Sequence, residues 1–400
     1  AGNNLSLTAG AAMTGTNSAF TAGNNLSLTA GTSLTANNST VTATTGSATI
    51  QASGGDLSMN VSTITANTSV TGTASGAMLL DASTATADTD LSLTAGAAMT
   101  GTTSTFIAGH DLSLTAGTSL TANHSTVTST TGSTTLSANS GTLSATSATL
   151  RAGTSLTGTA GGAVLLDAST GVAGTTLDFA ASAALTASQS ALSAGTDLSL
   201  VAATNGLLDT NASVTGGGSV RLTATAGTLD VDHASAVVAT KGSVTGLSGQ
   251  SLAVRAASTL NGKTSLTLTA GTLMTITDSS LIAQTGALGL ASQAGSITAD
   301  SAAISATLGS IQLGATGGGI TLTDPGTATE LTAGDNVTAV ATGNILIDKL
   351  TRITAAHSIA LTAGASLTID NATLQAMAGS VSASASAGLE VRNNAVVSAD

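Results

Sequence analysis

The sequence contains no cysteine, tryptophan or tyrosine, and only one proline and three phenylalanines among its 400 residues. So few aromatic side chains disfavour a broad globular core. A thin core of Leu, Val, Ile and Ala, one side chain deep, is what this chain can fill. The absence of cysteine excludes disulfides, but it fits the cytosol and an extracellular protein equally well.

Charge is also scarce, because charged residues make up 7% of the chain and only eight of them are Lys or Arg. Nucleic-acid binding needs clustered basic residues, so the composition argues against it. No run of 18 apolar residues occurs, so no membrane-spanning helix is expected. The chain starts at Ala1 inside a repeat without an initiator Met or signal peptide, and we interpret it as a segment of a longer protein.

Repetition at two levels dominates what is present. The stretch AGNNLSLTAG at residues 1–10 returns 21 residues later at 22–31, and residues 22–47 return 86 residues later at 108–133. Residues 1–86 and 87–172 are two copies of one unit, about two-thirds identical without gaps. Such a period, with mean hydropathy of +0.40 and regularly placed apolar residues, favours a β-solenoid over a disordered chain.

Apolar residues alternate with polar ones over short runs, which is the strand period. They also align in three columns with a step of about 21 residues, and four coils make one 86-residue unit. The first column contains Leu5/Leu7, Leu26/Leu28, Ile50, Val70, Leu91/Leu93 and Leu112/Leu114; the second Met13, Leu34, Leu57, Met78, Met99, Leu120, Leu143 and Val164; the third Phe20, Val41, Ile64, Phe106, Val127 and Leu150.

Three short strands per coil predict an all-β fold, a three-sided parallel β-helix with 21–23 residues per coil and roughly 19 coils. Right-handed coiling is expected by analogy with parallel crossovers. We expect residues 1–400 to form one continuous solenoid segment. It comprises a first super-repeat at 1–86, a second at 87–172 and diverged coils at 173–400.

The turns repeat the motif Ala-Gly-x-x-Leu. Its glycines are predicted to supply positive φ angles, and the Asn or Asp before each strand is expected to bond backbone amides and to stack into ladders. Pro325 is placed in a turn, because proline would interrupt a strand ladder. The glycines are Gly2, Gly23, Gly109, Gly174 and Gly195, and the polar residues are Asn4, Asn25, Asp90, Asp111 and Asp197.

Carboxylates are the first candidates for chemistry, since a polysaccharide hydrolase needs a local pair of them. Asp81 and Asp167 are 86 residues apart, about four coils or 19 Å by strand spacing. That separation is too large for one site. We therefore interpret the aspartates that follow apolar strands as structural turn residues: Asp81, Asp167, Asp209, Asp348 and Asp370.

The four histidines are interpreted as solvated turn residues, and no catalytic, cofactor or metal site is assigned. His110 and His124 stand where the first copy has Asn24 and Asn38. A position that alternates between Asn and His within one chain is typical of a turn surface. The other two histidines are His233 and His357. Calcium-binding repeats need a GGxGxD pattern, which Gly54-Gly55-Asp56 does not continue.

Outward threonines are frequent, as in Thr40-Val41-Thr42. Flat Thr-x-Thr arrays resemble those of ice-binding β-helices, which need one face of nearly unbroken threonine pairs. Because this chain mixes in Ser, Ala and Asn, the simpler interpretation is that Thr is a good exposed strand residue.

The coil pattern Ala-Gly-x-x-Leu-Ser-Leu-Thr-Ala-Gly-x-x-Leu-Thr resembles that of the filamentous-haemagglutinin family. These are large exoproteins of bacterial two-partner secretion, and they include contact-dependent inhibition proteins. The resemblance covers most of the 400 residues as repeat style only. The family's N-terminal secretion domain is not in this sequence, and the coils are slightly longer than is typical. The resemblance implies a right-handed β-helix, a Gram-negative cell surface and a role in adhesion or as a stalk.

The sequence therefore predicts a non-enzymatic structural rod of a bacterial cell-surface adhesin or extracellular fibre. Its partners would be a host or bacterial surface receptor, or further copies of itself. Two alternatives stay open. One is a self-associating filament or matrix protein, with rods packed side to side or end to end. The other is a carbohydrate-binding or carbohydrate-cleaving β-helix, which would need clustered Asp, aromatic or basic residues in a cleft.

Overall fold

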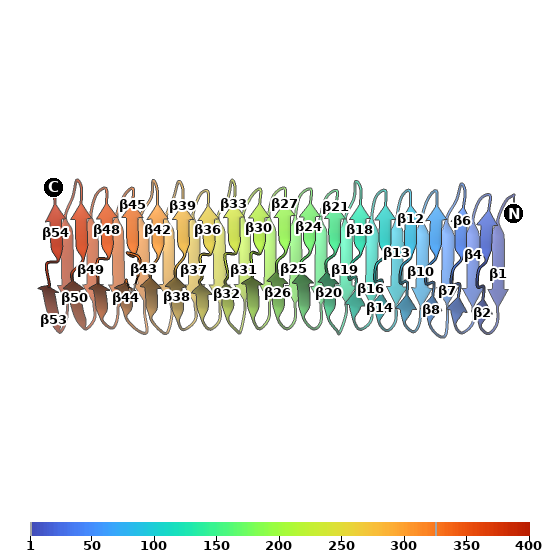
Figure 1. Cartoon of the computed structure of the whole chain (residues 1–400), viewed down its shortest axis with the longest axis horizontal. Coiled ribbons are helices and arrows are strands. Elements are labelled where there is room, and N and C mark those ends of the chain that lie inside the picture. Colours follow the sequence, from blue (N-terminus) through green and yellow to red (C-terminus); the bar gives the residue numbers. More distant parts are fainter. Residues whose placement is uncertain (1, 325) are drawn as a thin grey trace. The chain divides into compact units, whose positions relative to one another are not determined.

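The computed structural model describes residues 2–324 and 326–400, which form strands and turns without any helix. Pro325, predicted to lie in a turn, falls outside the described residues. Two compact units can be distinguished, Ala1–Gly195 (unit 1) and Thr196–Asp400 (unit 2), and each is described by itself. Within each unit the strands succeed one another along a single direction (Figure 1).

The 27 strands of unit 1 make nine turns of three strands, and each strand pairs in parallel with its equivalents in the neighbouring turns. Sheet A contains β1 (Leu5–Ala9), β4 (Leu26–Ala30), β7 (Ala48–Ala52), β10 (Val70–Ala74), β13 (Leu91–Ala95), β16 (Leu112–Ala116), β19 (Thr134–Ala138), β22 (Leu156–Ala160) and β25 (Leu177–Ala181). Sheet B contains β2 (Met13–Thr14), β5 (Leu34–Thr35), β8 (Leu57–Ser58), β11 (Met78–Leu79), β14 (Met99–Thr100), β17 (Leu120–Thr121), β20 (Leu143–Thr146), β23 (Val164–Asp167) and β26 (Leu185–Ser188). Sheet C contains β3 (Ala19–Ala22), β6 (Thr40–Ala43), β9 (Thr63–Ala66), β12 (Thr84–Ala87), β15 (Thr105–Ala108), β18 (Thr126–Ser129), β21 (Thr149–Ala152), β24 (Thr170–Ala173) and β27 (Ala191–Ala194).

Unit 2 has the same construction, again with 27 strands in nine turns. Sheet A here contains β28 (Leu198–Ala202), β31 (Val220–Ala224), β34 (Val244–Ser248), β37 (Leu266–Ala270), β40 (Leu288–Ser292), β43 (Ile311–Ala315), β46 (Val337–Ala341), β49 (Ile359–Ala363) and β52 (Val381–Ala385). Sheet B contains β29 (Gly206–Asp209), β32 (Leu229–Val231), β35 (Leu252–Val254), β38 (Met274–Thr277), β41 (Ile297–Asp300), β44 (Ile320–Thr323), β47 (Ile345–Asp348), β50 (Ser366–Asp370) and β53 (Gly388–Arg392). Sheet C contains β30 (Ser213–Gly216), β33 (Ala236–Ala239), β36 (Thr259–Gly262), β39 (Ser280–Ala283), β42 (Ala303–Ala306), β45 (Glu330–Ala333), β48 (Arg352–Ala355), β51 (Thr373–Ala376) and β54 (Val396–Ala399).

The three-sided parallel solenoid predicted from the apolar columns is confirmed. Met13 pairs with Leu34, which pairs in turn with Leu57, and the second column continues in register to Val164. In the third column, Ala85 fills the place between Ile64 and Phe106 that the sequence interpretation had left empty. Alternate residues of each strand point inward and are buried, so the core is a stack of thin Leu, Val, Ile and Ala layers.

The predicted turn length holds throughout unit 1 but is exceeded in unit 2. Val220 pairs with Val244 and Ile311 pairs with Val337, and both steps are longer than any between equivalent strands of unit 1. The extra residues lie in the connections, because the paired strands keep their lengths. Because these turns contain more residues than expected, the described residues form about 18 turns, whereas 19 were predicted. The hand of the coil stays a prediction.

The corner between sheets B and C contains a left-handed residue in every turn of unit 1. These residues are Asn17, Asn38, Val61, Ala82, Thr103, His124, Ser147, Ala168 and Gln189, with φ between 47° and 55°. No described glycine has positive φ, so the prediction that Gly2, Gly23, Gly109, Gly174 and Gly195 supply it is wrong. At three of them glycine is required by close approach. A Cβ at Gly109, Gly174 or Gly195 would lie 1.8–2.0 Å from a carbonyl oxygen of the preceding turn.

Val61 is the most strained of these corner residues. It is β-branched, it has φ of 52°, and its side chain is 61% exposed, so packing does not compensate. The equivalent residue one turn earlier is Asn38, with φ of 49°. Asn tolerates this conformation because its short polar side chain can bond locally.

We expect Val61→Asn to stabilise its corner by about 1 kcal/mol, since the left-handed conformation costs an ordinary residue about 1–2 kcal/mol. Native-state hydrogen exchange of the amides in that corner would report the gain. The matched reverse change, Asn38→Val, should lower protection one turn away by a similar amount. Equal protection in Val61→Asn and the parent would contradict the assignment of strain.

A ladder of buried serines runs beside the same corner in unit 1. In four successive turns a serine backbone N–H donates to the hydroxyl of the equivalent serine in the next turn, at 3.0–3.2 Å. The donors are Ser39, Ser62, Ser83 and Ser104. Each hydroxyl in turn donates to a backbone carbonyl of the preceding turn, as Ser62 does to Ala36 at 2.7 Å. Hydrogen bonds of this kind fix one turn upon the next in addition to the three strand ladders.

Candidate functional site

The turn that leads into sheet A carries the ladder of Asn and Asp side chains that the sequence predicted. The Asn4 side-chain oxygen accepts the Asn25 backbone N–H at 3.1 Å. In the second copy the Asp90 carboxylate accepts the Asp111 N–H at 3.1 Å, and the Asp111 carboxylate accepts the Ser133 N–H at 2.8 Å. The acceptors therefore serve the following turn, rather than the local amides that were expected.

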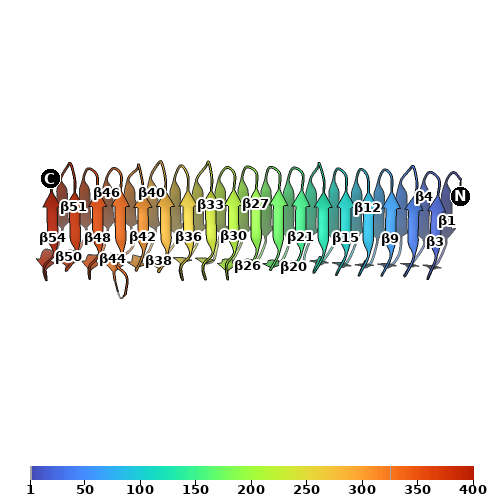
Figure 2. The same cartoon turned by 45° about the horizontal axis from the view of Figure 1, so that its top comes forward.

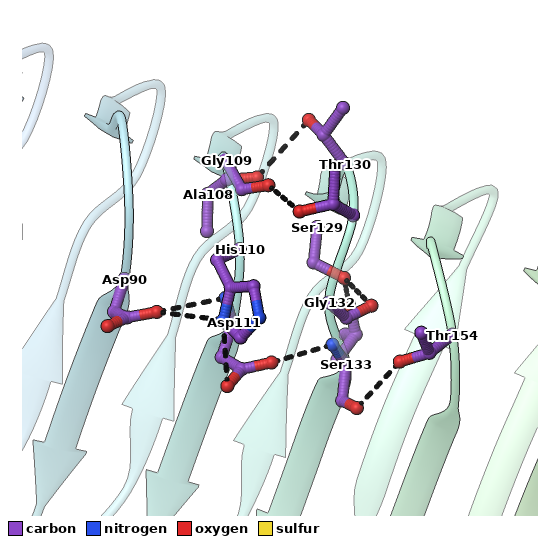
Figure 3. Close-up of polar contacts among 12 residues, drawn as sticks. Asp90, Ala108, Gly109, His110, Asp111, Ser129, Thr130, Gly132, Ser133 and Thr154 are labelled. Carbon is purple, nitrogen blue, oxygen red and sulfur yellow. Dashed lines mark hydrogen bonds and ion pairs between the residues drawn. The ribbon is translucent and has the colours of Figure 1, made fainter.

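His110 lies between two of these carboxylates (Figure 3). Its Nδ1 is 3.4 Å from Asp90 Oδ1 and 3.1 Å from Asp111 Oδ2. All three side chains are more than half exposed: His110 is 61% exposed, Asp90 56% and Asp111 55%. Solvent therefore screens the ion pairs, and their contribution to stability is small. The prediction that His110 is a solvated turn residue is confirmed, but its carboxylate partners were missed.

Three potential metal ligands thus meet within 4.8 Å of one another at Asp90, His110 and Asp111. One imidazole and two carboxylates are a donor set that suits Zn²⁺. However, one oxygen of each aspartate already accepts a backbone N–H of the next turn, and the first copy has Asn at all three places. The arrangement is explained by its role in joining turns, and we assign it no metal.

A second charged cluster lies on unit 2 around the corner between sheets B and C. His233 Nδ1 is 2.6 Å from Asp209 Oδ1, and Arg255 lies 3.2 Å from Asp232 and 3.5 Å from Asp230. Partial burial raises the pKa of the Asp230 carboxyl, while the nearby Arg255 guanidinium opposes this shift. The cluster thus places three carboxylates against one guanidinium and one imidazole, and its contacts join adjacent turns.

The candidate carboxylates of the sequence analysis divide into two groups. Asp81 and Asp167 lie four turns apart, as predicted, and Asp81 accepts the backbone N–H of Thr102 at 3.0 Å. Asp348 and Asp370, by contrast, are in register on adjacent strands β47 and β50, so a local carboxylate pair does exist there. Arg392 lies 2.8 Å from Asp370, and hydrogen bonds from Asn393 and then Arg392 hold the pKa of Asp370 below its usual range.

The remaining histidines also lie on turns. His124 is an exposed corner residue with φ of 53°, and His357 Nδ1 is 3.1 Å from Asp335. A shallow cleft of about 430 Å³ on unit 2 is lined by Ser, Thr and Ala residues together with Asp278 and Glu330. No aromatic or basic side chain lines it, so it does not resemble a saccharide subsite.

Comparisons of the chain with protein-family models, with curated proteins and with solved structures found no match. The fold is therefore what places this protein in a class: it is a β-solenoid repeat protein. None of its described segments is a helix long and apolar enough to cross a membrane.

Proposed function

We propose that the chain is a non-enzymatic structural shaft, part of a bacterial cell-surface adhesin or extracellular fibre. The observation that carries the proposal is the repeated construction of the turns. In unit 1, equivalent residues of the two super-repeats occupy equivalent places four turns apart, so length grows by adding turns without changing the cross-section. Repeat proteins of this kind are stabilised mainly by interactions between neighbouring turns.

The distribution of ionisable groups supports the same function. In unit 1, Asp81, Asp90 and Asp111 accept backbone N–H groups of the following turn, and His110 pairs with Asp90 and Asp111. Such groups join turns and keep the surface hydrated. The repeat pattern also resembles that of filamentous-haemagglutinin-like exoproteins, which is a further argument for a surface or secreted location. At such a location the ligand would be a receptor on another cell.

Deletion of residues 87–172 tests the shaft proposal. It removes four whole turns and joins Thr86 of β12 to Ala173, the last residue of β24. The register is kept because Ala87 and Ala173 occupy equivalent places. The deletant should fold with an unchanged β-type circular dichroism spectrum. Unit 1 should be shorter by about 19 Å in electron micrographs. Cells that display the protein should attach as before.

An out-of-register deletion is the matched control. Removing only residues 87–97, about half a turn, should disrupt the neighbouring turns and lower the β-type signal. If the folded four-turn deletant loses attachment altogether, a specific binding site lies in the deleted turns and the passive shaft must be abandoned.

A further inference from the structure

The outer face of sheet C in unit 1 gathers threonines from distant parts of the sequence into two straight rows. The first row is unbroken over seven successive turns, and each member is in register with the next: Thr40, Thr63, Thr84, Thr105, Thr126, Thr149 and Thr170. The second row lies two residues further along each strand and contains Thr42, Thr65, Thr86 and Thr128, with Ile107 in the place between the last two. Arg151 and Val172 end the second row.

None of the threonine hydroxyls in these two rows makes a hydrogen bond to the described part of the protein. This distinguishes them from turn threonines such as Thr44 and Thr45, whose hydroxyls donate to carbonyls of the preceding turn. Every hydroxyl of the array is therefore left to donate and accept outward. The β-branched side chain is stiff at χ1, so the hydroxyl and methyl groups are held in place before any partner arrives.

The array is regular in two directions. Along the solenoid the rows repeat at the spacing of parallel strands, about 4.8 Å, and along each strand alternate residues are about 6.6 Å apart. Strands β9, β12 and β15 stand side by side and nearly parallel in Figure 2. From β6 to β18 the two outward rows contain no charged residue, although the whole chain has a formal charge of −12.

A partner for this face must be uncharged, must offer both donors and acceptors, and must repeat on a rigid lattice. A second copy of the chain is disfavoured as the partner. The threonine face, seven turns long and two rows wide, covers roughly 400 Å² on each partner. Stable protein interfaces bury about 1,200–2,000 Å² in total. A crystalline polysaccharide is disfavoured by the absence of aromatic rings from the face. Crystalline water satisfies all three requirements, and its groups are already ordered, so association orders little on either side.

We propose that the threonine face of sheet C, from β6 to β18, binds ice. This inference goes beyond the shaft function and does not depend on it. The sequence as a whole argues against ice binding, because it mixes Ser, Ala and Asn among its threonines. Sheet C of unit 1 is the exception, because its first outward row is threonine in seven successive turns. The outward rows of sheet A also carry threonines, but Ser27, Gln51 and Ser92 interrupt them.

The test measures thermal hysteresis and the partitioning of the protein into a growing ice front. The parent chain should show both. Thr84→Tyr, which places a bulky ring in the middle of the first row, should abolish most of the activity. Ile107→Thr, which fills the one gap in the second row, should increase it, and a merely structural residue would not give that gain.

Two controls carry the same bulky change on the other faces of neighbouring turns, Thr94→Tyr on sheet A and Thr100→Tyr on sheet B. Both should keep the parent's activity, and all variants should keep its circular dichroism spectrum. The proposal is overturned by a parent without thermal hysteresis, by an active Thr84→Tyr, by an Ile107→Thr without gain, or by an equal loss in either control.

Discussion

Replacing Phe106 by Ala should lower the local free energy of unfolding in unit 1 by about 3–5 kcal/mol, the range for removing a buried phenyl ring. Phe106 is 1% exposed and is among the largest fully buried side chains. Its ring extends over Gly101, where an added Cβ would lie 2.6 Å from the ring. The glycine provides the space that the phenylalanine fills, so the truncation leaves a void that no neighbour is placed to close.

The same pairing of a large side chain with a small one is found at other places in the core. Leu80 and Ala85 occupy the two places one turn earlier, so there a large residue again accompanies a small one. Gly158 accommodates the ring of Phe179 in the same manner in sheet A. A second variant, Gly101→Ala, should therefore also destabilise, and Phe106→Leu should relieve part of that cost.

Phe20 provides the internal control. It is the equivalent of Phe106 in the first copy and lies over Gly15, so the predicted equivalence of place is confirmed. However, Phe20 is only half-buried, because it lies in the first described turn and packs against a turn on one side only. Phe20→Ala should thus cost clearly less than Phe106→Ala.

Native-state hydrogen exchange would show both losses and their extent. Since a solenoid is stabilised between neighbouring turns, the decrease in protection should stay within a few turns of the substitution. Uniform loss of protection throughout unit 1, or equal losses in the two variants, would contradict this account.

Much of the fold follows from sequence because apolar side chains that recur once per turn must all face one thin core. The register of Met13, Leu34 and Leu57 could be read directly from their spacing and is confirmed. The failures share a different origin. The glycines were predicted to have positive φ angles. What excludes a side chain at Gly109 is instead a carbonyl oxygen of the preceding turn. Sequence spacing alone does not reveal such a neighbour.

The candidate sites were missed for a related reason. His110 and Asp90 are separated by almost a whole turn of the sequence yet are adjacent in space, and the threonine rows appear only when five strands are laid in register. The buried serines, in contrast, do have a signal in the sequence. Ser39, Ser62, Ser83, Ser104 and Ser125 recur at the same step as the apolar columns. A polar residue that keeps the step of a core column is expected to be buried and bonded.

That serine column gives the second large effect. Ser104→Ala removes a buried hydroxyl that accepts the Ser83 backbone N–H at 3.1 Å and donates to the Leu80 carbonyl. Each buried polar group left without a partner costs about 1–3 kcal/mol, so protection of the amides around Ser83 should decrease strongly. Ser92→Ala, which removes a hydroxyl on the outer face of β13, should leave the exchange rates unchanged.

Ser104→Thr separates the hydrogen bonds from the shape of the site. In unit 2, Thr329 and Thr351 occupy the corresponding corner, are fully buried, and bond to neighbouring turns through their hydroxyls. Threonine at residue 104 should therefore restore most of the protection that alanine loses. Ala148 already interrupts the ladder in unit 1, and its N–H donates to Ser169, so the loss in Ser104→Ala should be confined to adjacent turns. A Thr variant as unprotected as the Ala variant would show that packing, and not the hydroxyl, determines stability at this corner.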